Sequence, residues 1–135
     1  MIEDLFSKSL AEAVHLITSR LISAVDLAET YLNRIEEVNP SLNAVVTIAP
    51  DILESARRCD SELERGNIIG PLHGVPLTIK DTIDTEGLRM TSGSRLLKNN
   101  IPDRDATVVA RLKSAGAIIL GKTNVPEMAA YILAP

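Results

Sequence analysis

Hydrophobic residues in the first third of the chain recur every three or four positions, a spacing that predicts helices. Residues 9–12 (Ser-Leu-Ala-Glu) form a capping box, and Ser23 with Asp26 repeats this arrangement before a second helix. The apolar stripe of that second helix consists of Ala24, Leu27, Ala28, Tyr31, Ile35 and Val38. Asn39-Pro40 predicts its end, because a residue that precedes proline avoids the helical region.

Short β-branched runs alternate with helical spacing in the remainder of the chain. Residues 42–48, 75–80 and 117–121 are predicted strands, the second of them buried and ending in Lys-Asp. Helices are predicted after Pro50 as far as Gly66, and over 105–115 with Asp103 or Asp105 as the cap. The order strand 75–80, helix 105–115, strand 117–121 fits a crossover unit. We therefore predict an α/β fold with parallel strands.

Composition narrows the class of protein. With 135 residues, 45% of them hydrophobic, the chain is predicted to be one domain with a largely aliphatic core. The net charge is -4 and no basic run exceeds two residues, which argues against nucleic-acid binding by this segment. One cysteine and two distant histidines cannot form a metal cluster. No signal peptide and no membrane-spanning run is visible, so a cytoplasmic location is expected.

Lys80 is the strongest candidate for chemistry. It ends a predicted buried strand inside a Gly/Pro-rich frame, where partial burial would disfavour the charged amine and favour a general base. The alternative from the residues alone is a surface lysine paired with Asp81. Lysines with altered proton affinity are uncommon, so residue type by itself favours this alternative.

Other polar residues are weaker candidates. His73 lies in a turn and is expected to be solvated, and Cys59 is expected to be an unreactive thiol on a helix. The hydroxyls of Ser92 and Ser94 could line a pocket, but turn residues commonly bind their own backbone. Lys122 repeats the pattern of Lys80 at a strand end, and we interpret it as structural.

Four stretches of the chain together resemble the amidase-signature family. They are residues 70–81 (Gly-Pro-Leu-His-Gly-Val-Pro-Leu-Thr-Ile-Lys-Asp), 87–94 (Gly-Leu-Arg-Met-Thr-Ser-Gly-Ser), 105–112 (Asp-Ala-Thr-Val-Val-Ala-Arg-Leu) and 116–124 (Gly-Ala-Ile-Ile-Leu-Gly-Lys-Thr-Asn). The resemblance covers residues 9 to about 128 in order and spacing. Such a series of motifs is far more specific than any one of them.

The resemblance implies a serine hydrolase of carboxamide bonds with a Ser-Ser-Lys triad. The lysine at the position of Lys80 would act as base, through a bridging serine, on a nucleophilic serine. A Gly/Ser-rich loop would supply the bridging serine and an oxyanion hole, and an acyl-enzyme would then be hydrolysed or transferred. The implied fold is a mixed sheet flanked by helices. A small-molecule amide is the expected substrate, and no cofactor, metal or membrane is expected.

The chain departs from the family in one respect. In the family both triad serines follow the lysine motif in a Gly/Ser-rich signature, and no such stretch occurs before Pro135. Residues 1–135 are thus expected to be the incomplete N-terminal part of one amidase domain, with a helical start over about 1–40 and an α/β part over about 41–135. Alone, the chain is expected to be inactive.

Three functions remain open. The first is an amidase. The second is the A subunit of a tRNA-dependent amidotransferase, although residues 124–128 (Asn-Val-Pro-Glu-Met) are closer to the general amidases than to that protein, which more often has Asn-Met-Asp-Glu-Phe. A homodimer or amidotransferase partner subunits are the corresponding assemblies. The third, of another class, is a non-catalytic remnant that serves as an interaction module.

Overall fold

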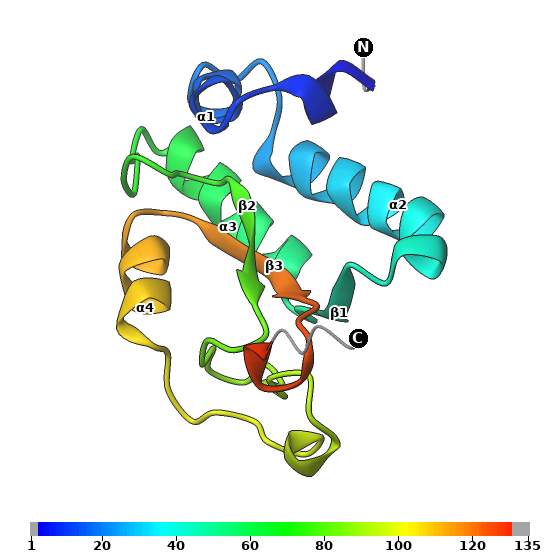
Figure 1. Cartoon of the computed structure of the whole chain (residues 1–135). Helices are drawn as coiled ribbons and strands as arrows, with labels where there is room; N and C mark the ends of the chain where they lie inside the picture. The colour runs from blue at the N-terminus through cyan, green and yellow to red at the C-terminus, as the bar shows by residue number, and fades with distance from the viewer. Residues whose placement is uncertain (1–2, 131–135) are drawn as a thin grey trace.

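The structure is a computed structural model that describes residues 3–130, and it shows helices packed around a small sheet (Figure 1). In chain order the elements are η1 (Glu3–Ser7), α1 (Leu10–Thr18), α2 (Ala24–Leu42), β1 (Val45–Ile48), α3 (Ile52–Glu64), β2 (Pro76–Lys80), η2 (Arg95–Leu97), α4 (Thr107–Ser114), β3 (Ile118–Thr123) and η3 (Glu127–Ala129). The fold is α/β with a mixed sheet flanked by helices, as predicted.

Both predicted capping boxes are present. The Ser9 backbone N–H donates to the Glu12 carboxylate at 2.7 Å, and the Glu12 N–H donates back to the Ser9 hydroxyl. Ser23 and Asp26 make the same pair of bonds at the start of α2. Hydrogen bonds from Ser23 hold the pKa of Asp26 below its usual value. The two helices therefore begin where the sequence pattern predicted.

The predicted end of α2 at Asn39-Pro40 is wrong, because the helix continues to Leu42 with Pro40 inside its last turn. Contacts with β1 account for this extension. The Asn39 side chain donates to the Val45 carbonyl at 2.8 Å and accepts from the Val45 N–H at 2.9 Å. Asn43 then ends the helix with a φ of 49°, in the left-handed conformation.

The sheet has the order β1-β3-β2, with β3 parallel to β2 and antiparallel to β1. The parallel pair is joined through α4, which confirms the predicted crossover unit. Every residue of β3 from Ile118 to Lys122 is buried, as expected for a central strand. In β2, by contrast, Thr78 and Lys80 are exposed, so the prediction that this strand is buried throughout is wrong.

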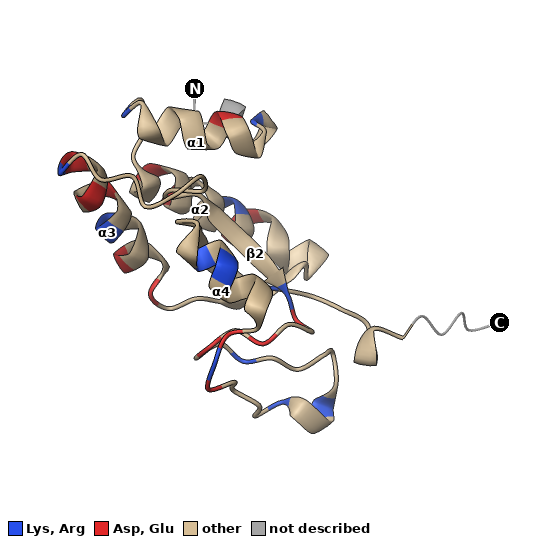
Figure 2. Ribbon diagram, turned by 90° about the vertical axis from the view of Figure 1, so that its left-hand side faces the viewer, with Lys and Arg blue, Asp and Glu red and all other residues tan. Residues whose placement is uncertain are grey.

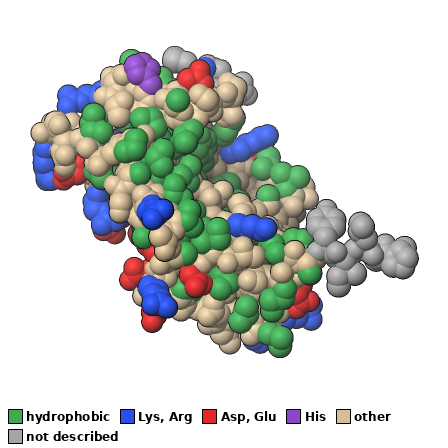
Figure 3. All heavy atoms as spheres, turned by 60° about the vertical axis from the view of Figure 1, so that its left-hand side comes forward, with side chains coloured by type: hydrophobic (Ala, Val, Ile, Leu, Met, Phe, Trp, Pro, Cys, Tyr) green, Lys and Arg blue, Asp and Glu red, His purple; other side chains and the backbone are tan. Residues whose placement is uncertain are grey.

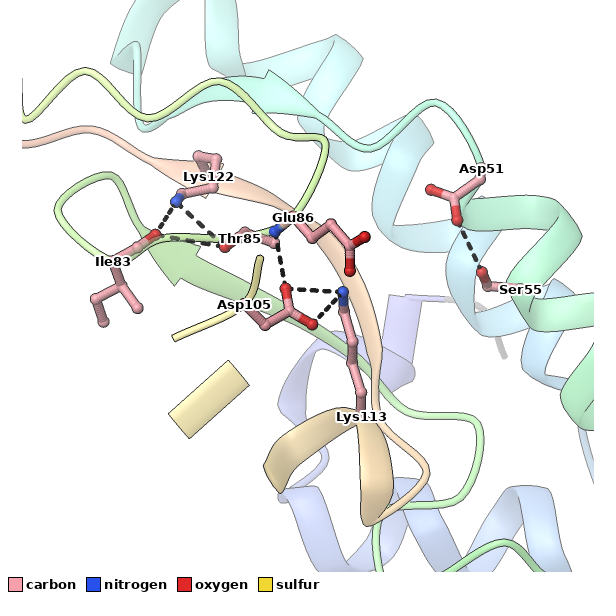
Figure 4. A network of polar contacts seen from close by, with 8 residues as sticks. All are labelled: Asp51, Ser55, Ile83, Thr85, Glu86, Asp105, Lys113 and Lys122. Atoms are coloured by element: carbon pink, nitrogen blue, oxygen red, sulfur yellow. Dashed lines mark hydrogen bonds and ion pairs between the residues drawn. The ribbon is translucent and has the colours of Figure 1, made fainter. Parts of the chain in front are cut away.

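The cap predicted for α4 is also different. Ala106 occupies the N-cap position, and no side chain caps the helix. The Asp105 carboxylate instead accepts a hydrogen bond from the Glu86 N–H at 2.8 Å and forms an ion pair with Lys113 at 2.7 Å (Figure 4). These contacts join the loop after β2 to the last turn of α4.

The core is aliphatic, as the composition predicted. Its most deeply buried members include Ile17, Ala24, Ala28, Ala56 and Val109, all with no exposed surface. On the face drawn in Figure 3, hydrophobic side chains nevertheless form a continuous band between charged groups. None of the helices within residues 3–130 is both long and apolar enough to cross a membrane.

Candidate active site

The carboxyl ends of β2 and β3 meet at one edge of the sheet, because the two strands are parallel. Lys80 and Asp81 leave β2 at this edge, and Asn124 follows β3. Lys80 pairs in register with Thr123, and the Asp81 N–H donates to the Thr123 carbonyl at 3.0 Å. Ligands of open α/β sheets bind preferentially at such an edge. The best sequence candidate for catalysis thus lies at the position that the topology favours.

Lys80 is exposed, which corrects the expectation of a partly desolvated amine. Side chains alternate between the two faces of a strand, so Lys80 shares its face with the exposed Thr78, while Ile79 points into the core. Among the described residues Lys80 has neither an ion pair nor a side-chain hydrogen bond. The alternative of a surface lysine paired with Asp81 is therefore not what the geometry shows either.

The Asp81 side chain points away from solvent and is 1% exposed. One carboxylate oxygen accepts hydrogen bonds from the Thr91 N–H, at 3.1 Å, and from the Thr91 hydroxyl. The Ser92 N–H also donates to the Asp81 carbonyl at 2.8 Å. The second carboxylate oxygen, Oδ1, has no partner within the described part of the chain. Asp81 thereby fastens the segment 91–94 beside the end of β2.

Residues 91–94 also contact the segment that follows β3. Gly93 has a φ of +69°, and a Cβ at this position would lie 2.4 Å from the Val125 carbonyl oxygen, so only glycine fits. The Met128 N–H donates to the Ser92 carbonyl at 2.7 Å. Ser94 is buried, donates to the Glu127 carboxylate at 2.7 Å and accepts from the Leu96 N–H. Its hydroxyl therefore serves a turn, as the sequence predicted.

Lys122 is the buried lysine of this edge, with no exposed surface. Its ammonium donates to the Ile83 carbonyl and, at 3.3 Å, to the Thr85 hydroxyl (Figure 4). Burial lowers the pKa of Lys122 from its ordinary value, and the negative charges of Asp81 and Asp84 act in the opposite direction. The desolvation expected of Lys80 thus occurs at Lys122 instead.

His73 is buried without exposed surface, which contradicts the expectation of a solvated loop histidine. Its Nδ1 accepts from the Ile69 N–H at 3.1 Å, while Nε2 has no partner in the described residues. Two backbone bonds, Leu72 N to Ala115 O and Gly74 N to Gly116 O, hold this turn against the start of β3. This packing buries the His73 ring between the turn before β2 and the start of β3.

Cys59 is buried on α3, and burial raises the pKa of its thiol. The raised pKa agrees with the prediction of an unreactive side chain. A groove of about 960 Å³ lies between α3, residues 85–88 and the start of β3, and neither Lys80 nor Lys122 lines it. Basic and acidic positions are mixed along α3, where Arg57 and Arg58 lie between Glu54 and Asp60 (Figure 2). No group of three metal-ligating side chains occurs in residues 3–130.

The sequence therefore located Lys80 but missed the polar groups that frame it. Thr85, Thr91 and Glu127 were not singled out, and their partners lie far away in the chain. One signal was available, since Lys122 repeats at the end of β3 the pattern of Lys80 at the end of β2.

The geometry defines a class of protein: an α/β fold with a lysine at the carboxyl edge of two parallel strands. A family model described as Amidase matches residues 26–134, and the chain belongs to this family. The A subunit of the glutamyl-tRNA(Gln) amidotransferase from Carboxydothermus hydrogenoformans is 45% identical over 127 residues, which are 93% of this chain and 26% of that protein. The corresponding protein from Heliobacterium modesticaldum is 41% identical over 126 residues, with the same coverage.

Solved structures support the same family. The native peptide amidase from Stenotrophomonas maltophilia superposes with a TM-score of 0.85 and 38% identity, over 89% of this chain and 25% of that enzyme. An amidase family protein from Bacillus anthracis gives a TM-score of 0.86 and 35% identity, over 93% and 26% of the two chains. The chain thus spans about a quarter of the length of the relatives that it matches.

Proposed function

We propose that this chain is the lysine-bearing part of an enzyme that cleaves carboxamide bonds, with Lys80 as the general base. The observation that carries the proposal is the position of Lys80, at the carboxyl edge of two parallel strands and with its amine unpaired among the described residues. An amine that already held a carboxylate partner would keep its proton and could not accept another. Asp81, the residue next to Lys80 in the sequence, is bound to Thr91 instead.

The proposed chemistry is acyl transfer through serine. A neutral Lys80 amine accepts the proton of a serine hydroxyl, directly or through a bridging serine, and the resulting oxygen attacks the amide carbonyl. The amine of the substrate leaves with a proton, and an ester remains on the enzyme until water or another acceptor cleaves it. Both serines would come from the Gly/Ser-rich signature that the family resemblance implies, outside residues 1–135.

The A subunit of a glutamyl-tRNA(Gln) amidotransferase is the second candidate function. It is favoured by relatives of that name, which are 41% and 45% identical to this chain. The peptide amidase is 38% identical and favours the first candidate, as do residues 124–128. Both functions begin with release of ammonia or an amine from a carboxamide. They differ in what receives the nitrogen, and in the partner subunits that an amidotransferase requires.

The proposal can be tested by grafting. In a chimera, residues 9–128 of this chain replace the matching quarter of the Stenotrophomonas maltophilia peptide amidase. In a second chimera, the same residues replace the matching quarter of the Carboxydothermus hydrogenoformans amidotransferase protein. We expect ammonia release from a peptide amide by the first chimera, from glutamine by the second in the presence of its partner subunits, and loss of either activity with Lys80→Ala. Full activity of the Lys80→Ala chimeras would contradict the proposal and favour a non-catalytic interaction module.

A further inference from the structure

Lys122 is a buried ammonium whose bonded partners are neutral oxygen atoms. Lys122 is 0% exposed and Thr85 is 1% exposed, so the contact between them excludes solvent. No carboxylate lies within ion-pair distance of Lys122 in the part of the chain that the structure describes. Burying a charge without a paired carboxylate is costly. A lysine retained under these conditions calls for an explanation beyond filling the core.

Two successive hydrogen bonds connect the Lys122 side chain to the backbone of Lys80. The Lys80 carbonyl accepts from the Ile83 N–H at 3.0 Å, which closes the turn after β2. The Ile83 carbonyl in turn accepts from the Lys122 ammonium (Figure 4). Thr85, two residues further on, accepts from the same ammonium at 3.3 Å. Lys122 therefore binds both ends of the short segment 83–85 that follows the candidate base.

Strand register separates the side chain of Lys122 from that of Lys80. Lys122 pairs with Ile79 and Lys80 pairs with Thr123 in the parallel ladder. Paired residues of neighbouring strands share a face, and successive residues alternate. Lys122 thus lies on the core side with Ile79, whereas Lys80 lies on the exposed side. The hydrogen bonds that connect Lys122 to Lys80 therefore run through the backbone of the turn.

Asp81 holds the same turn from the other direction. Its carboxylate binds Thr91, and its negative charge, with that of Asp84, offsets the cost of the buried ammonium. Asp81, the residue directly after Lys80, is fixed by its bond with Thr91, and the segment 83–85 is fixed by Lys122. Lys80 is consequently the exposed end of a strand whose continuation is anchored on both sides by buried polar groups.

We propose that Lys122 is a positioning residue for Lys80: its ammonium, bound to the Ile83 carbonyl and the Thr85 hydroxyl, fixes the turn that sets where the Lys80 side chain begins. This inference rests on the proposed function of Lys80. Loss of the anchor would displace the base from its proton donor, and small displacements of a catalytic group lower turnover much more than they alter substrate binding.

The anchor itself can be tested in the 135-residue chain, without any activity. Hydrogen exchange is followed at the Ile83 amide, with the Ala49 amide, which donates to the Leu120 carbonyl at 2.9 Å, as the reference in the same sheet. We expect Ile83 to exchange about 10-fold faster relative to Ala49 in Lys122→Met and Thr85→Val, and unchanged in Thr85→Ser and in the surface control Lys98→Met. An unchanged ratio in both Lys122→Met and Thr85→Val would overturn the anchor.

The consequence for Lys80 is tested in the peptide amidase chimera. We expect Lys122→Met and Thr85→Val to lower kcat about 10-fold with KM within about twofold, and Thr85→Ser to retain kcat. If Lys122→Met does not fold, the Thr85→Val and Thr85→Ser pair decides the question, because valine lacks the hydroxyl that binds Lys122 and serine retains it. Parental kcat in Thr85→Val, with Lys80→Ala inactive, would overturn the positioning role and leave the proposed function intact. Activity in Lys80→Ala would instead reject the proposed function.

Discussion

Lys80 and Lys122 occupy matching places in the fold and contrasting environments. Each lies at the carboxyl end of a strand of the parallel pair, and their backbones are adjacent in the ladder. Lys80 is exposed and has no bonded partner among the described residues, whereas Lys122 has no exposed surface and donates to two oxygens. The register of one residue separates a candidate catalytic amine from a structural one.

The contrast shows how burial and catalysis divide between two like residues. The buried lysine has the lowered pKa, yet its ammonium is already committed to Ile83 and Thr85. The exposed lysine has a free amine at the edge where ligands bind. Burial lowers the pKa of Lys122, which bonds within the fold, whereas Lys80 is exposed at the edge of the sheet.

The largest expected effect concerns Lys80 in the peptide amidase chimera. Lys80→Arg should lower kcat by about 100-fold or more, because a guanidinium cannot lose its proton near neutral pH and so cannot act as a base. Steady-state kinetics with a peptide amide measures this effect, and the surface variant Lys98→Met serves as a control. Turnover of Lys80→Arg within a few-fold of the parent would make Lys80 a charge or packing residue.

For folding stability, Lys122 should matter more than Lys80, which is the reverse of the order expected for turnover. Lys122→Ala leaves a cavity and removes the ammonium that donates to the Ile83 carbonyl and the Thr85 hydroxyl, and should lower the free energy of unfolding by about 2–4 kcal/mol. Lys80→Ala should change it by less than about 0.5 kcal/mol, because the side chain is exposed. Urea unfolding of the 135-residue chain followed by circular dichroism compares them. Equal losses would contradict the structural contrast between the two lysines.

Asp81→Asn should have an intermediate effect. Asparagine keeps one side-chain oxygen that can accept from Thr91, but its NH₂ group takes the place of the buried, unpartnered Oδ1, and Lys122 loses an opposing charge. We expect a loss of about 1–3 kcal/mol in the free energy of unfolding. Asp103→Asn, at an exposed position, is the matched control. Equal stability of the two variants would show that the negative charge of Asp81 contributes nothing to stability.

The smallest effect is the pH dependence of Lys122. Because burial lowers its pKa in the folded chain below the ordinary 10.5, the unfolded chain binds the proton more tightly. The contribution of Lys122 to the free energy of unfolding is then complete above pH 10.5, and it is lost as the pH falls through the pKa of Lys122 in the folded chain. The stability of the parent relative to Lys122→Met should therefore rise as the pH increases toward 10.5. A flat or falling difference contradicts the lowered pKa.

Local signals predicted much of the fold. The two capping boxes and the start of the core stripe of α2 depend on residues close in sequence, and the crossover between β2 and β3 follows from the order of the elements. The misses came from side-chain contacts that these patterns do not show. The side chain of Asn39 extends α2 through Pro40 by binding Val45, and Lys113 with Glu86 draws Asp105 away from the cap of α4.

The candidate site was proposed from a family motif more than from burial or charge. The motif singled out Lys80, whose catalytic role stays a proposal, but it did not show that Lys80 is exposed, because exposure depends on which face of β2 the rest of the fold covers. The burial of His73 depends on a turn packed against residues 115–116, which no local pattern encodes. The anchors of the edge, Thr85 and Thr91, lie 37 and 10 residues from their partners. Only the folded chain shows which groups these hydroxyls meet.

The most direct test of Lys80 as a base is chemical replacement of its amine. Lys80→Cys is prepared in the peptide amidase chimera, in a background without other reactive cysteines, and Cys59 is replaced by alanine as well. The new thiol is alkylated either to an aminoethyl group, which can lose a proton, or to a trimethylammonioethyl group, which carries the same charge permanently. We predict that aminoethylation restores turnover and that trimethylammonioethylation does not. Equal restoration by both groups would show that Lys80 supplies a charge and not a base.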